Sequence, residues 1–340
     1  MKLYLLAIVL SFLTFNSIAQ DSIVKSENHF IKTIKVFGNL YAGYYHGLNG
    51  KSTPNSAFNM PTALLGVSSE IAKNVKTTLI YDVTRTTNFS YTDTSGISGY
   101  FEGSKYTAYL KMAQIDWKIK PFLMLSVGQL LNEQYLTVQD KWWGHRYVDV
   151  TFQEKNRFGM PADFGARFTY FYKEKISFSL TAVNGEGPFR YQDDDGKHLI
   201  SGNLQYNPNK KLMLKFYADI QNSAIPESIS RMAFSAFGGY KIEKLMVGAE
   251  FNMLNNSNYS SDSNYDYSGL SFYSAYNFKE KVQVFGRYDA MLAHNNPLLK
   301  DYLIAGIQYS PAKSYNISIN YRNNSGTEEQ VIFINFGATF

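Results

Sequence analysis

The sequence predicts an all-β fold, a transmembrane antiparallel up-and-down β-barrel of about 16 strands with short periplasmic turns and long extracellular loops. The first observation behind this prediction is an alternation of short lysine-bearing turns with long polar connections. Barrels of the outer membrane have this rhythm, tight at the periplasmic rim and long outside. The seven short turns begin at residues 71, 118, 172, 207, 241, 278 and 310, and with the two ends of the chain they account for sixteen strands.

The second observation is a period of two in the apolar residues of the extended segments. A membrane barrel needs one apolar face along every strand, whereas a soluble sheet needs it only on some. In the segment 211–221, Leu214, Phe216 and Ile220 share one face, and Lys215 and Asp219 share the other. The segments 162–172, 281–290 and 314–322 alternate in the same way.

Two segments alternate less regularly. The pattern slips near Ala113, where we expect a β-bulge, and both faces of 122–131 are apolar. The expected strands are 32–45, 60–72, 75–86, 104–119, 122–132, 162–173, 175–184, 197–207, 211–222, 230–242, 244–255, 266–279, 281–292, 300–310, 314–323 and 328–340.

The beginning of the chain resembles an export signal. A positive Lys2 and an apolar run over 3–15 precede the small-residue ending Ser17-Ile18-Ala19, which predicts a cleaved signal peptide over 1–19 and a barrel domain over 20–340. An uncleaved membrane helix is the alternative, but the run is short for a span. Together with the barrel pattern, this predicts the outer membrane of a Gram-negative bacterium. The sequence has no cysteine, which excludes disulfides and thiol chemistry.

Aromatic residues make up 16% of the chain, and many stand beside the short turns on the face expected to be outward. An interfacial girdle would place them there, although Tyr and Phe are also good strand formers. The girdle candidates are Trp117, Tyr172, Tyr206, Tyr240, Phe278, Tyr309 and Tyr315. The net charge of +5 is dispersed, so no nucleic-acid partner is expected. Outer-membrane lipid is the expected surrounding.

The chain ends in an alternating strand that closes on Phe340. This ending resembles the signal that the barrel-assembly machinery reads in outer-membrane barrels, which implies that machinery as a partner during biogenesis.

The third long connection, 133–161, is the longest and differs in composition from the Asn/Ser/Asp-rich connection at 255–265. It contains Trp142, Trp143 and other aromatic residues together with several charges. Such a composition favours a packed insert over a loose surface loop.

The segment 138–147, continuing through 151–153 to 162–166, is similar to porin-like outer-membrane proteins related to the phosphate-selective porins. The resemblance implies passive diffusion of small hydrophilic solutes or ions through a channel narrowed by the third loop. It places five polar residues at the constriction, and because general porins are trimers it leaves a homotrimer open. The five residues are Asp140, Lys141, Arg146, Asp163 and Arg167.

The lumen expected from strand parity carries mixed charges, unlike the Lys/Arg ladders on which phosphate-selective channels depend. Its expected bases are Lys111, Arg167, Lys215, Arg287 and Arg322. Its expected acids are Asp82, Asp116, Asp163, Asp219, Glu250 and Asp289. Each charge could equally be a solvated or paired wall residue. Opposed charges are typical of a general diffusion pore.

Other functions find less support in the sequence. The five histidines form no motif with Ser or Asp, so no catalytic residue, metal ligand or cofactor is expected. The run 193–196 is first a solvated turn, with a calcium contact as the alternative. A non-transport barrel that serves an assembly or secretion machine is the main rival to a channel.

Overall fold

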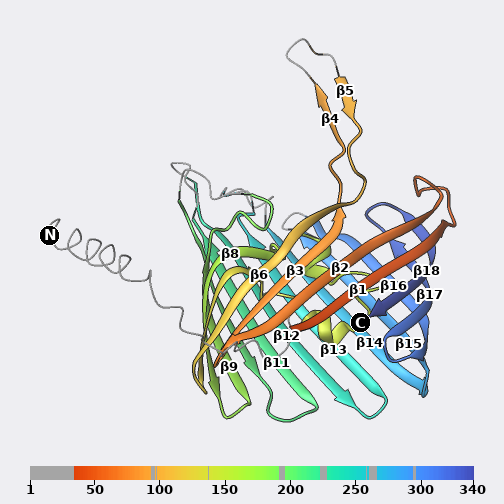
Figure 1. Cartoon of the computed structure of the whole chain (residues 1–340). Helices are drawn as coiled ribbons and strands as arrows, with labels where there is room; N and C mark the ends of the chain where they lie inside the picture. Colours follow the sequence, from red (N-terminus) through yellow and green to blue (C-terminus); the bar gives the residue numbers. More distant parts are fainter. Residues whose placement is uncertain are drawn as a thin grey trace, which may run out of the picture.

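Sixteen antiparallel strands close into one barrel (Figure 1). The computed structural model describes residues 34–92, 96, 98–136, 138–190, 196–222, 228–257, 259, 266–293 and 296–340. The expected signal peptide and the turn at 193–195 therefore lie outside the described residues. Among the described residues, no helix has the length and apolarity that a membrane crossing requires.

Neighbouring strands in the chain are neighbours in the barrel, and the first and last strands pair to close it. The barrel strands are β1 (Ile34–Gly47), β2 (Ser56–Ala72), β3 (Val75–Arg85), β6 (Thr107–Lys120), β7 (Leu123–Leu131), β8 (Ala162–Tyr172), β9 (Ile176–Val183), β10 (Leu199–Tyr206), β11 (Leu212–Gln221), β12 (Arg231–Ile242), β13 (Leu245–Asn255), β14 (Tyr267–Lys279), β15 (Val282–Ala293), β16 (Asn296–Ala312), β17 (Tyr315–Asn324) and β18 (Glu329–Thr339). Each coincides with one predicted strand, and the largest differences are starts four residues earlier in β2 and β16. The predicted fold class is confirmed.

The predicted alternation of faces is also present. In β11, Lys215 is 1% exposed inside the barrel, whereas the next residue, Phe216, is 46% exposed on the outer wall. Six of the seven girdle candidates are 40–62% exposed, and Tyr315 is half-buried. The outer wall is therefore apolar, with aromatic rings near the turns, as a wall in contact with lipid requires.

The slip in alternation near Ala113 is a bulge in β6. Ile80 pairs with Met112 and Tyr81 with Leu110, so Lys111 is an extra residue on β6. The bulge lies two residues from its predicted position.

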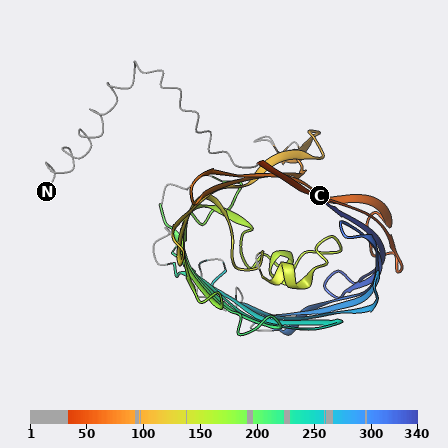
Figure 2. The ribbon, with the colours of Figure 1, turned by 60° about the horizontal axis from the view of Figure 1, so that its bottom comes forward.

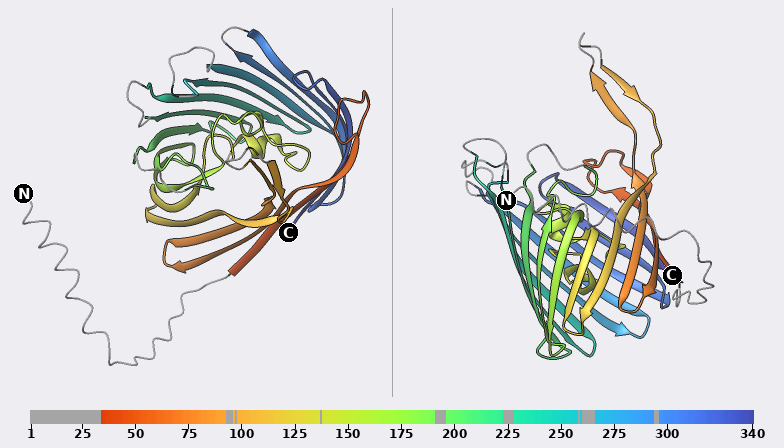
Figure 3. Two further views of the ribbon diagram at one scale, coloured as in Figure 1. Left: turned by 90° about the horizontal axis from the view of Figure 1, so that it is seen from above. Right: turned by 60° about the vertical axis from the view of Figure 1, so that its left-hand side comes forward.

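The structure adds a hairpin within a connection that the sequence predicts as a loop. Strands β4 (Phe89–Thr92) and β5 (Ser98–Phe101) pair only with each other and stand above the rim of the barrel (Figures 1 and 3). The hairpin belongs to the second outer connection, between β3 and β6.

Phe340 lies at the seam where the barrel closes. Gly38 of β1 and Phe340 exchange two backbone hydrogen bonds, of 2.9 and 3.1 Å. A Cβ on Gly38 would lie 2.4 Å from the Phe340 ring, so only glycine admits the ring here. The role of Phe340 as an assembly signal remains a prediction.

Candidate functional site

Residues 133–136 and 138–161 enter the barrel, and the segment 133–161 is named the lumen insert from here on. It contains the short helices α2 (Gln139–Trp143) and α3 (Phe152–Lys155), and it crosses the interior of the ring in Figures 2 and 3. Its polar and apolar side chains contact inward-facing residues of β11 to β18, as the following contacts show.

An aromatic core joins the lumen insert to the wall. The buried Trp143 ring packs edge-on against Tyr273 and Phe285, with centroids 5.7 and 6.0 Å apart. Trp142 donates its indole N–H to the carbonyl of Val247 at 2.8 Å. Gly239 makes room for this ring, because a Cβ there would lie 2.4 Å from it. This half of the lumen is therefore packed like a protein core.

Three inward bases predicted for the lumen bind the lumen insert instead of free solvent. Lys215 donates to the carbonyl of Gln134 and to Oε1 of Gln139, the latter at 2.8 Å. Arg322 donates to the carbonyl of Val148 at 2.8 Å. Lys215, Arg322 and Arg287 are all buried. Hydrogen bonds from a buried base to backbone carbonyls hold in place the segment to which those carbonyls belong.

Arg287 is the third of these bases. Its guanidinium donates to the carbonyl of Val150 and is held by the carboxylate of Asp289 at 2.7 Å. Ser271 donates to the same carboxylate at 2.6 Å. The Arg287–Asp289 pair thus lies on the wall directly behind the lumen insert.

Asp149 is the centre of a second contact between the lumen insert and the wall. Its Oδ2 accepts from Lys155 Nζ and from the Tyr302 hydroxyl, both at 2.7 Å, and Arg322 Nη1 lies 3.8 Å away. Burial alone would raise the pKa of Asp149, but the charges of Lys155, Arg322 and Arg287 hold it well below its usual range. Asp149 therefore stays ionised at any physiological pH.

His145 lies inside the aromatic core and is 2% exposed. Its Nδ1 is 2.7 Å from the Trp143 carbonyl, to which a neutral ring donates its N–H. Burial lowers the pKa of His145 to about 4. The ring is therefore neutral at pH 7.

The opposite side of the lumen insert carries an ionic cluster. Arg146 Nη1 donates to Asp140 at 2.8 Å and to Glu154 at 2.7 Å, and Nη2 donates to Glu154 at 2.8 Å. The three side chains remain 16–21% exposed. Burial raises the pKa of Asp140, and Arg146 opposes that rise. Lys111 of β6 adds a favourable charge to Asp140 and is itself paired with Asp82 of β3 at 2.9 Å.

The five residues predicted at the constriction fall into separate places. Asp140 and Arg146 meet in the ionic cluster, and Lys141 is exposed on α2 without a bond to any described residue. Asp163 and Arg167 lie on β8, where the lumen insert joins the wall. Arg167 donates to the Leu131 carbonyl at 3.0 Å, and Asp163 accepts from the Gly185 N–H at 2.6 Å. Sequence analysis did not single out Glu154 and Asp149.

The remaining acids predicted for the lumen have partners on the wall or on the lumen insert. Asp116 accepts from Ser126 at 2.6 Å, and Glu250 accepts from Gln153 of the lumen insert at 3.1 Å. Asp219 is paired with Arg231 at 3.0 Å. Among the described residues, no group of three or more His, Asp or Glu side chains is placed to hold a metal ion.

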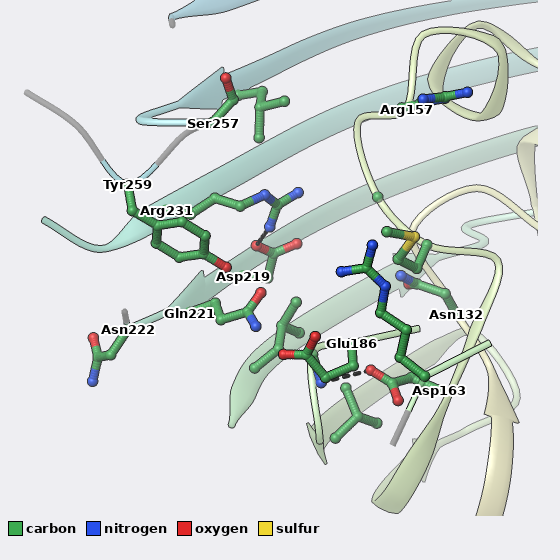
Figure 4. Close-up of a pocket in the computed structure, with 17 residues that line it drawn as sticks. Asn132, Arg157, Asp163, Glu186, Asp219, Gln221, Asn222, Arg231, Ser257 and Tyr259 are labelled. Carbon is green, nitrogen blue, oxygen red and sulfur yellow. Dashed lines mark hydrogen bonds and ion pairs between the residues drawn. The ribbon is translucent and has the colours of Figure 1, made fainter. Parts of the chain in front are cut away.

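A cavity of about 470 Å³ opens at the outer mouth, between the returning limb of the lumen insert and strands β8 to β13. Figure 4 shows side chains from β11, β12 and two outer loops around this space, which is named the outer pocket from here on. Its charged residues are Arg157, Arg190, Arg231, Asp163, Glu186 and Asp219.

Comparisons with known proteins agree with this architecture. Residues 161–324 match the family described as putative beta-barrel porin-2, OmpL-like. The matched residues make up just under half of the chain, and the closed sixteen-stranded barrel has the fold of the porins. The resemblance to the phosphate-selective group in particular is not confirmed. No curated protein matches the chain in sequence.

Solved structures similar to this porin-like barrel share its fold. OmpF of Salmonella typhi, in complex with daunomycin, superposes with a TM-score of 0.65 at 11% identity over 90% of this chain and 97% of that one. A loop L8 deletion mutant of OmpT from Vibrio cholerae gives 0.62 at 12% identity, over 91% and 99%. OprB of Pseudomonas putida, at low pH, gives 0.58 at 9% identity, over 90% and 92%.

Proposed function

We propose that this protein is a porin in the outer membrane of a Gram-negative bacterium, through which small hydrophilic solutes or ions diffuse passively. In this proposal the lumen insert narrows the channel, and the chain has no catalytic role. One observation carries the proposal. The lumen insert is fixed to one wall by Lys215, Arg287 and Arg322, while its ionic cluster is turned toward the other wall.

The path for solutes follows from the difference between these two sides. Toward β11 to β18 the side chains that join the lumen insert to the wall, among them Trp143, Lys215 and Arg287, are buried. Toward β3 and β6 the ionic cluster is partly exposed and lies within electrostatic reach of Lys111. A barrel of sixteen strands is wide enough to keep a water-filled space beside an insert. Solutes would therefore pass between the ionic cluster and the β3–β6 wall.

The charges along this path imply a weak preference for cations. Its acids are Asp82, Asp140 and Glu154, against the bases Lys111 and Arg146. Three acids facing two bases leave one negative charge, which raises the local concentration of cations and lowers that of anions. The proposal thus assigns Asp140 and Arg146 to the constriction. It leaves Lys215, Arg287 and Arg322 to position the lumen insert.

Single-channel conductance in a planar bilayer tests the proposal. The purified chain should give unit current steps, and deleting residues 138–150 should enlarge them, because the segment that narrows the path is lost. Deleting residues 89–101, the hairpin above the rim, is the matched control and should leave the steps unchanged. A reversal potential in asymmetric salt should show the preference for cations.

A barrel that folds but gives no current would contradict the proposal. If such a silent barrel copurified with a partner in fixed ratio, the role in an assembly or secretion machine would replace it. One similar structure is a trimer form of OmpT from Vibrio cholerae. We therefore include a homotrimer in the proposal, to be tested by the mass of the purified particle.

A further inference from the structure

The outer pocket is blind at its lower end. Asp219 of β11 lines it, and the next two inward-facing residues along β11, Tyr217 and Lys215, are fully buried. On β12, Arg231 lines the pocket, and the next inward residues, Ala233 and Ser235, are buried as well. A solute that enters this cavity from outside therefore cannot continue through the barrel on this side. The geometry is that of a binding pocket rather than of a passage.

The charges of the outer pocket balance. Its three arginines face three acids, and the buried Asp219 is already neutralised by Arg231 at 3.0 Å. Asp163 is also occupied, because its two oxygens accept the backbone N–H groups of Phe164 and Gly185 at 2.7 and 2.6 Å. An anion bound here would lie close to carboxylates, and a cation close to guanidinium groups. Neither gains a net attraction, so the lining favours a neutral ligand.

The uncharged part of the lining combines many hydrogen-bonding groups with a few apolar ones. Amides and hydroxyls come from Asn132, Gln221, Asn222, Ser257 and Tyr259, and apolar surface comes from Met160, Val183, Leu199 and Leu254. In Figure 4 the labelled side chains of Gln221, Asp219 and Tyr259 are turned toward the same space. Amides, carboxylates and arginines offer donors and acceptors side by side, which is what a ring of alternating hydroxyls requires.

We propose that the outer pocket binds a neutral saccharide of one or two rings at the mouth of the channel. Hydroxyl edges of the sugar would meet the amide and charged side chains, and the C–H faces would meet the apolar residues. A volume of about 470 Å³ is within the range of small-molecule pockets. The inference rests on the proposed function, because the pocket would hold a solute at the outer mouth of the proposed channel, beside the path that solutes take.

Equilibrium binding of three probes of similar size tests the inference on the purified barrel in detergent. Saturation-transfer NMR would compare glucose, glucuronate and glucosamine, three ring sugars that are neutral, anionic and cationic. Glucose is expected to bind, and each charged probe is expected to bind more weakly. Ser257→Trp fills the pocket from an outer loop and should abolish the glucose signal. Ser90→Trp, on the hairpin outside the pocket, is the matched control and should leave it unchanged.

Glucose binding that survives Ser257→Trp, or its absence from the wild type, would overturn the inference. Tighter binding of glucuronate or glucosamine than of glucose would overturn the inference that the ligand is neutral. Conductance measurements distinguish a failure of the saccharide inference from a failure of the proposed channel function. The pocket is off the path, so the unit current of Ser257→Trp should equal that of the wild type. A conducting barrel that binds no glucose refutes only the pocket.

Discussion

Replacing Arg146 by glutamine tests how the lumen insert keeps its shape. Arg146 Nη1 donates to one oxygen of Asp140 at 2.8 Å and to one of Glu154 at 2.7 Å, so these two oxygens are at most about 5.5 Å apart. With the guanidinium gone, two negative charges at that distance repel by about 3 kcal/mol at an effective dielectric constant of 20. The population of displaced conformations of the lumen insert should then rise on the order of a hundredfold.

The assay is current noise from single channels in a planar bilayer at pH 7. Channels of Arg146→Gln should fluctuate between conductance levels, whereas the current through wild-type channels should stay at one level. Lys141→Gln is the matched control, because it removes the same charge from the same segment and breaks no bond to a described residue. Lowering the pH should quieten Arg146→Gln when it is combined with His145→Gln, because a proton on either carboxyl ends the repulsion and the acid response of His145 is absent. Equal noise in Arg146→Gln and Lys141→Gln, or noise in the combined variant that grows with acid, would refute this reasoning.

Three further predictions concern other parts of the molecule. Asp149→Asn should destabilise the attachment of the lumen insert by about 3–5 kcal/mol, because Arg322 and Lys155 lose their carboxylate. The pKa of Asp149 is depressed in the folded state, so the advantage of the wild type over this variant should be full at neutral pH and should shrink as the pH falls below the usual Asp range, as measured by trypsin cleavage at neutral pH and by thermal melting in acid. Acid should loosen the lumen insert through His145, because the pKa of His145 is about 4 in the folded state and 6.5 ordinarily. The free energy that holds the insert in place should fall by about 3 kcal/mol as the pH drops from 6.5 to 4. The resulting current noise should be weaker in His145→Gln. Deleting 89–101 should leave the heat resistance of the barrel on gels unchanged, because β4 and β5 pair with no barrel strand; a lower melting temperature would show a hidden contact.

The strands could be predicted from the sequence because the membrane imposes one simple rule on all of them. Lipid outside and water or protein inside require alternation, so the faces of Phe216 and Lys215 could be assigned without coordinates. The hairpin β4–β5 stands clear of the membrane, where no such rule acts. Its segment is short and rich in Ser, Thr and Gly, which made it look like an ordinary loop.

The candidate site was only partly predictable. The period of two along a strand shows whether a side chain faces inward or outward, but it does not show which group that side chain contacts. Sequence analysis placed Arg287 and Arg322 inside the barrel, and both side chains do face inward. Their partners are backbone carbonyls of Val150 and Val148, which carry no sequence signal at all. Glu154 could have been suspected, since it is a charged residue eight positions from Arg146 in the same segment.

The aromatic core in the lumen has a consequence for how the chain reaches its final form. Trp143 and its neighbours are enclosed by β12 to β16, by Tyr41 of β1 and by the lumen insert itself. The lumen insert comes before β8 in the chain, but its aromatic core packs on β12 to β16, which follow much later. Its tryptophans therefore have no finished surface to pack on until the last third of the sheet has formed.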